Sequence, residues 1–68
     1  MKTQRVDVDL KLWFDGEVWR YKLHERRFIG TEKVAEKQLE QGFSDDFDEL
    51  LSEALAEARQ HAEVLRNG

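Results

Sequence analysis

The chain has 68 residues and no cysteine, which limits it to one domain with a small core and excludes a disulfide framework. Its net charge of −4 is divided unevenly, with seven basic and five acidic side chains in residues 1–30 but four basic and ten acidic ones in residues 31–68. The longest run of large apolar residues covers only 12–14, so the sequence also excludes a membrane-spanning helix.

The N-terminal half has the pattern of a β-hairpin. Residues 5–14 alternate between apolar and polar side chains, which is typical of a half-buried strand. Asp15-Gly16 follows, a pair favoured in two-residue type I′ turns, and a second β-rich run comes after it. The sequence therefore predicts a two-stranded antiparallel hairpin over about 5–29.

A two-residue loop would separate the side chains of this hairpin onto two faces. It would place Trp13 beside Val18, and Lys11 opposite Arg20, on the polar face. The apolar face would collect Val6, Val8, Leu10, Leu12, Phe14, Trp19, Tyr21 and Leu23. We expect the helical part of the chain to cover that apolar face.

Two helices are predicted after the hairpin. Thr31 can cap a short helix over about 31–41, which Gly42 would end. A longer helix is expected over about 44–66, with Ser44 or Asp45 as its N-cap. One arc of the longer helix is apolar and holds Phe47, Leu50, Leu51, Ala54, Leu55, Ala58, Ala62 and Leu65.

These elements predict a single α+β domain over 1–68 with the order ββαα. A two-stranded sheet is marginally stable alone, and both of its strands are edges that could pair with another chain. We therefore expect a homodimer in which a second copy completes the sheet, or in which helices pack through the small residues Ala54, Ala58 and Ala62.

The sequence contains no recognisable catalytic or metal-binding constellation. Ser44 and Thr31 stand where helices are expected to begin, which gives their hydroxyls a structural role. The two histidines, His24 and His61, are far apart in the sequence and have no neighbouring ligands at the spacing of a zinc site. We predict a protein that is not an enzyme and that needs no cofactor or metal.

The polar face of the hairpin is the candidate binding surface. Tryptophan and arginine are enriched among the residues that dominate protein interfaces, and basic strands with aromatics also suit nucleic acid. The same residues could instead clamp the turn and solubilise an exposed sheet face. The predicted site consists of Lys11, Trp13, Val18, Arg20 and Lys22.

We predict a small protein-interaction module that acts by binding a partner protein, as a regulator or an inhibitor. The acidic helical half would attract a basic protein surface and repel phosphates. The lack of cysteine and of an N-terminal apolar segment favours the cytoplasm. A structural scaffold, natural or designed, is an alternative, because the local signals are consistent with one another throughout the chain.

A second alternative is a dimeric nucleic-acid-binding regulator. The stretch Gly42-Phe43-Ser44, followed by Leu50-Leu51 and Ala54-Leu55, resembles the second helix of the ribbon-helix-helix repressors. The resemblance covers residues 18–60. It implies that Arg20, Lys22 and His24 enter the major groove of DNA from a strand.

Overall fold

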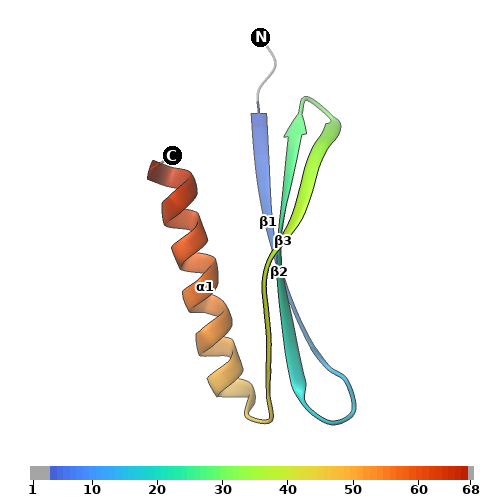
Figure 1. Ribbon diagram of the computed structural model, residues 1–68, viewed down its shortest axis with the longest axis vertical. Coiled ribbons are helices and arrows are strands. Elements are labelled where there is room, and N and C mark those ends of the chain that lie inside the picture. The colour runs from blue at the N-terminus through green and yellow to red at the C-terminus, as the bar shows by residue number, and fades with distance from the viewer. Residues whose placement is uncertain (1–3, 68) are drawn as a thin grey trace.

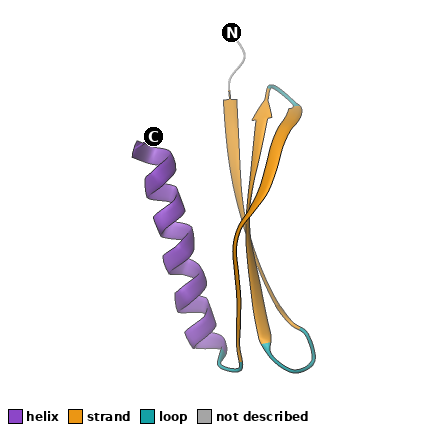
Figure 2. Cartoon of the chain, in the orientation of Figure 1, coloured by secondary structure: helices purple, strands orange, loops and turns teal. Residues whose placement is uncertain are grey.

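The computed structural model describes residues 4–67 as a three-stranded antiparallel sheet with one helix on one face. The strands lie in the order β1-β2-β3, so that β2 is central and both other strands are edges. Figure 1 shows α1 running back along one face of the sheet from the end of β3. The elements are β1 (Gln4–Phe14), β2 (Trp19–Ile29), β3 (Glu32–Ser44) and α1 (Phe47–Asn67), as Figure 2 shows.

The predicted ββαα order is wrong, because the segment expected to form a short helix over 31–41 is part of β3. The chain has the order βββα, and Gly42 lies inside a strand instead of ending a helix. The ribbon-helix-helix resemblance is therefore also overturned, because that family needs a strand followed by two helices. The long helix is the only helix within residues 4–67.

Pairing with β2 explains why a segment rich in helix-forming residues becomes a strand. An isolated helix of about a dozen residues is marginal in water. As a strand, the same segment satisfies the free backbone edge of β2, whose buried side chains leave those amides little access to water. Gly30 and Thr31 form the two-residue loop between β2 and β3. A type II′ hairpin turn needs a positive φ at its first residue only, and Gly30 has a φ of +65° whereas that of Thr31 is not positive.

The loop between β1 and β2 is two residues longer than the predicted turn. Residues 15–18 form it, with the Asp15 amide donating to the Val18 carbonyl at 3.1 Å. Asp15 Oδ1 in turn accepts hydrogen bonds from the amides of Glu17 and Val18 at 2.9 and 3.0 Å. The pairing is therefore shifted by two residues, so that Phe14 faces Trp19. A shift of two keeps every side chain on its predicted face.

The core lies between α1 and the half of the sheet near this loop. Tyr21, Leu50 and Ala54 are fully buried there, and Leu10, Leu12 and Trp19 pack against them in part. Trp19 contacts Phe14 and Phe47, with ring centroids 5.3 and 4.7 Å apart. The apolar face predicted for the hairpin is thus the face that α1 covers.

Tyr21 is packed unusually tightly against β3. A Cβ atom at Gly42 would lie only 2.6 Å from Cε1 of the Tyr21 ring, so the glycine makes room for that ring. The Tyr21 hydroxyl has no hydrogen-bond partner within residues 4–67. Burial, reinforced by the charges of nearby Glu53, Glu40 and Glu57, raises the pKa of this phenol above its ordinary value.

The helix is rotated relative to the orientation that its apolar stripe predicts. Leu50 and Ala54 are buried, but Leu55 and Ala62 of the same stripe are exposed. His61 is half-buried and bonds with the sheet. The apolar arc is therefore wider than the sheet covers. Within the described residues, α1 is also too polar for a membrane, and no helix could span one.

Candidate functional site

The face of the sheet opposite α1 carries two rows of aromatic and basic side chains near the 15–18 loop. The first row crosses all three strands as Trp13, Arg20 and Phe43. The second row, two residues further from the loop, consists of Lys11, Lys22 and Gln41. We call these six residues the open-face site.

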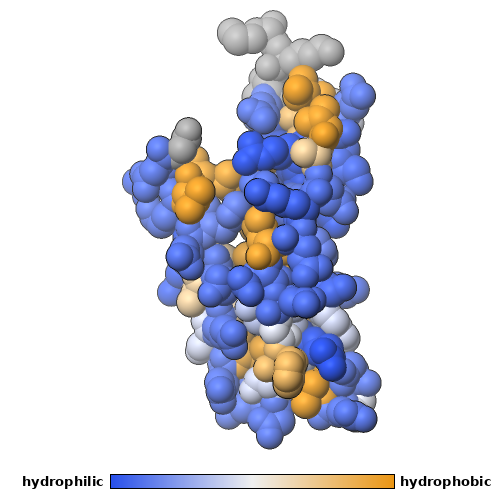
Figure 3. Space-filling view, in the orientation of Figure 1, coloured by the Kyte–Doolittle hydropathy of each residue, from blue (hydrophilic) through white to orange (hydrophobic). Residues whose placement is uncertain are grey.

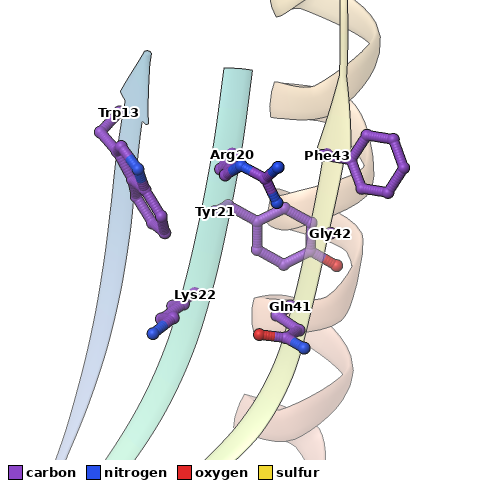
Figure 4. A pocket seen from close by; sticks show the side chains of 7 residues that line it. All are labelled: Trp13, Arg20, Tyr21, Lys22, Gln41, Gly42 and Phe43. Atoms are coloured by element: carbon purple, nitrogen blue, oxygen red, sulfur yellow. The ribbon is translucent and has the colours of Figure 1, made fainter. Parts of the chain in front are cut away.

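A hollow of about 300 Å³ lies between the two rows. Trp13, Arg20, Lys22, Gln41 and Phe43 contribute its walls, as Figure 4 shows. Tyr21 and Gly42 also line it, at a register position where neither projects a side chain onto this face. The Gly42 backbone therefore lines the hollow on the open face, while its missing side chain makes room for the Tyr21 ring on the covered face.

Arg20 is held in place at the centre of the first row. Its guanidinium forms an ion pair with Asp15 and lies over the Phe43 ring, 5.5 Å from the centroid. The hydrogen bond from Arg20, followed by those from the Val18 and Glu17 amides, holds the pKa of Asp15 well below its usual range. Phe43 is 66% exposed, the most exposed large apolar side chain among the described residues.

The second row has an uncompensated positive charge. Lys11 and Lys22 are direct cross-strand neighbours, and neither forms an ion pair in the part of the chain that the structure describes. Lys11 instead lies over the Trp13 ring at 5.5 Å. Like charges directly opposite each other destabilise a strand pair, and an anion between them would relieve that cost. The lining of the hollow contains two cationic side chains, Arg20 and Lys22, and no carboxylate.

The rest of the open face is neutralised by its own ion pairs. Arg26 bonds with Asp9 on one neighbouring strand and with Glu36 on the other. The hydrogen bond from Arg26 lowers the pKa of Asp9, and those from Lys33 and then Arg26 lower the pKa of Glu36. Unpaired positive charge is therefore confined to the half of this face near the loop.

A second polar cluster lies on the covered face, beneath the C-terminal half of α1. Glu25 is only 3% exposed, and its carboxylate contacts Arg27 at 3.1 Å and His61 Nε2 at 3.0 Å. Burial raises the pKa of Glu25, but the hydrogen bonds from Arg27 and His61 outweigh it and the net shift is downward. This cluster ties α1 to β2.

The predicted site residues are only partly brought together. Trp13, Arg20 and Lys22 line the hollow, and Lys11 adjoins it through Trp13. Val18 lies in the loop and not beside Trp13, whose strand partner is Arg20. Likewise, Lys11 faces Lys22 and not Arg20, because of the two-residue shift in register.

Sequence reasoning missed Gln41 and Phe43, which complete the site from β3. It missed them because residues 31–41 were assigned to a helix. No local pattern marked them, because the order polar, glycine, apolar, polar over residues 41–44 is not the alternation of a half-buried strand. Glu25 was missed as well, although it continues the inward parity of Tyr21 and Leu23.

Residues 4–67 contain no group of three or more histidine, aspartate or glutamate side chains that could hold a metal ion. His24 faces Asp9 across the strands, on a different row from the open-face site. The arrangement can therefore bind an anionic or aromatic group, but it offers no paired acid and base around the hollow. No protein-family model, curated protein or solved structure matches this chain.

Proposed function

We propose that this protein is a non-enzymatic interaction module that binds an acidic segment of a partner protein on its open-face site. The observation that carries the proposal is the hollow between Trp13, Arg20, Lys22 and Phe43, which combines the half-buried Trp13 ring and the exposed Phe43 ring with the positive charge of Lys22, a side chain without an ion pair within residues 4–67. A segment with an apolar or aromatic side chain flanked by carboxylates complements that combination.

The distribution of charge favours such a segment over a nucleic acid. A phosphate backbone would extend beyond the hollow to a part of this face where the cations already have carboxylate partners, Arg5 with Asp7 and Arg26 with Asp9 and Glu36. A short peptide can place one or two carboxylates on Arg20 and Lys22 without reaching those acidic side chains.

The proposal extends to the assembly and the location of the protein. We propose that the chain acts as a homodimer, because both edge strands of its sheet have a free backbone edge within residues 4–67. A cytoplasmic location fits a chain without cysteine. Binding without chemistry fits a regulator or an inhibitor, which blocks or recruits its partner by occupying a surface.

An amide NMR titration of the ¹⁵N-labelled chain tests the binding site. The probe is the acetylated, amidated pentapeptide Asp-Glu-Phe-Glu-Asp at low salt, and the matched control replaces its four carboxylates with lysines. We expect shifts at Trp13, Arg20, Lys22, Gln41 and Gly42 with the acidic peptide alone. These shifts should weaken as added salt screens the exposed charges.

Two results would overturn this function. The first is an acidic peptide that shifts no open-face amide at millimolar concentration, or that shifts the same amides no more than the lysine peptide does. The second is a short DNA duplex that produces larger shifts than the acidic peptide at the same salt concentration, which would assign the surface to nucleic acid.

A further inference from the structure

The two edges of the sheet differ in how well they could accept another strand. The pairing of β3 with β2 is interrupted by register shifts between Leu23 and His24 and between Arg27 and Phe28. Irregularities of this kind protect an edge strand from pairing with another chain. β1 pairs with β2 through an unbroken register and presents its other backbone edge without a partner in residues 4–67.

Part of the apolar surface that α1 leaves uncovered lies on the β1 side. Glu57, Gln60 and Val64 of the helix line a hollow with Leu39 and Glu40, which places that flank of α1 over β3. By helical geometry, the exposed Leu55 and Ala62 lie on the opposite flank, toward β1. The helix contacts β1 less than it contacts the other two strands.

Side chains of β1 on the same face are correspondingly exposed. Val8 is 40% and Phe14 54% accessible, although both belong to the row that faces α1. Leu10 and Leu12 are half-buried between them. An apolar strip thus runs along the β1 edge, next to the free backbone groups of that strand. A hydrophobic strip beside an open, regular edge is the surface that a strand from another chain would cover.

The charges of β1 favour a second copy of β1 as that strand. In an antiparallel pair about a two-fold axis at Leu10, Asp9 of each chain lies opposite Lys11 of the other. The inner row then pairs Leu10 with its own copy and Val6 with Phe14, which keeps apolar residues together.

The neighbouring registers are less favourable. An axis at Asp9 would set two Asp9 carboxylates directly against each other, and an axis at Lys11 would do the same with two lysines. An axis at Val8 would oppose Asp7 to Asp9. Like charges directly opposite across antiparallel strands are destabilising, so among these four registers the charges of β1 favour the axis at Leu10.

We infer that β1 pairs with β1 of a second copy about Leu10, which joins two sheets into one of six strands. The inference rests on the proposed homodimer and specifies its interface. Both helices then cover one face of the joined sheet, and both open-face sites lie on the other. The pairing would cover the apolar strip of Val8 and Phe14 and leave the irregular β3 edges outermost.

Cysteine pairs test this interface and its register, because the natural chain contains no thiol. The variants are Asp9→Cys and Lys11→Cys, each on the open face and exposed. Residues opposite each other in antiparallel strands have Cα atoms about 4.5–5.5 Å apart, within the range of a disulfide. We expect a mixture of the two variants to form far more disulfide-linked dimer than either variant alone. Light scattering of the unaltered chain should give twice its mass of 8.1 kDa.

Gln38→Cys, on β3 opposite His24, provides the matched control on the other edge. It should cross-link no more than background. A mass of 8.1 kDa at all concentrations would contradict both the homodimer and this interface. A dimer whose Asp9→Cys and Lys11→Cys mixture links no better than Gln38→Cys would retain the homodimer but overturn the β1 interface.

Discussion

The two faces of β2 are built from alternate residues of one strand, yet they make different kinds of contact. Tyr21, Leu23 and Glu25 point toward α1 and are buried. Arg20 and Lys22 point the other way, toward solvent and the hollow of the open-face site. The covered face therefore makes buried apolar contacts with α1, together with the buried hydrogen bond between Glu25 and His61.

Contacts on the open face are of a different kind. Its ion pairs and cation-π contacts are exposed, so each adds little to the stability of the fold. The comparison indicates that one face of the sheet holds the fold together while the other is available for binding. Substitutions on the two faces should therefore separate stability from affinity. Figure 3 shows that the surface is mostly hydrophilic and that its apolar side chains gather in separate patches.

The largest expected effect is at Leu50, which is completely buried between α1 and the sheet. Leu50→Ala should lower the free energy of unfolding by about 3 kcal/mol, because it leaves a cavity in a small core. Phe43→Thr, on the open face, keeps strand propensity and should change it by less than about 0.5 kcal/mol. Urea unfolding of both variants measures this difference. Equal losses would contradict the division between the two faces.

Gly42 makes room for the Tyr21 ring on the covered face. Gly42→Ala should cost about 2 kcal/mol of stability, because its Cβ would overlap the buried Tyr21 ring. Gln41→Ala, next to it on the exposed side, should cost less than about 0.5 kcal/mol. The cost at Gly42 should shrink when Tyr21→Leu is introduced first. A cost that is unchanged in the Tyr21→Leu background would show that the ring is not responsible.

Glu25 and Glu36 are a buried and an exposed carboxylate, and the same substitution at each should have different effects. Glu25→Gln should destabilise the fold by about 1–2 kcal/mol, since it weakens the bonds to His61 and Arg27 in a buried position. Glu36→Gln removes an exposed carboxylate that also has two partners, Arg26 and Lys33, and should cost less than about 0.5 kcal/mol. Thermal unfolding at neutral pH distinguishes them. A larger loss at Glu36 would be the opposite of this expectation.

Asp15 should make the smallest but most specific contribution, through pH. Because its pKa is lowered in the folded chain, its stabilising effect is present above about pH 4 and is lost as the pH falls toward the folded-state pKa. Asp15→Asn should therefore reduce the loss of thermal stability between about pH 5 and pH 3. Part of that loss of thermal stability should remain in the variant, because the pKa values of Asp9, Glu25 and Glu36 are lowered too. An unchanged pH profile would contradict the role assigned to Asp15.

Strict alternation made the first two strands and their faces predictable. Residues 5–14 have one apolar parity, and the two-residue shift in register preserved it. The length of the loop was less predictable, because Asp15-Gly16 also suits a four-residue loop closed by the Asp15 side chain. The open-face site was therefore predictable on β1 and β2, but its individual pairs were not.

β3 was not predictable from local pattern. Residues 32–41 are rich in glutamate, lysine and glutamine, which favour helices, and only the neighbouring edge of β2 makes them a strand. Gln41 and Phe43 entered the site only through that pairing. The rotation of α1 was equally hidden, because it brings together His61 and Glu25, which lie 36 residues apart in the sequence.

The measurement that tests the central claim most directly is the dissociation constant of the acidic pentapeptide for three chains, determined by isothermal titration calorimetry. Arg20→Gln should weaken binding roughly fivefold, about 1 kcal/mol, through the loss of a charge-assisted contact at the hollow. Lys33→Gln, which removes a positive charge at the far end of the same face, should leave it unchanged. An Arg20→Gln chain that binds as tightly as the natural one, or a Lys33→Gln chain that loses as much, would contradict the claim.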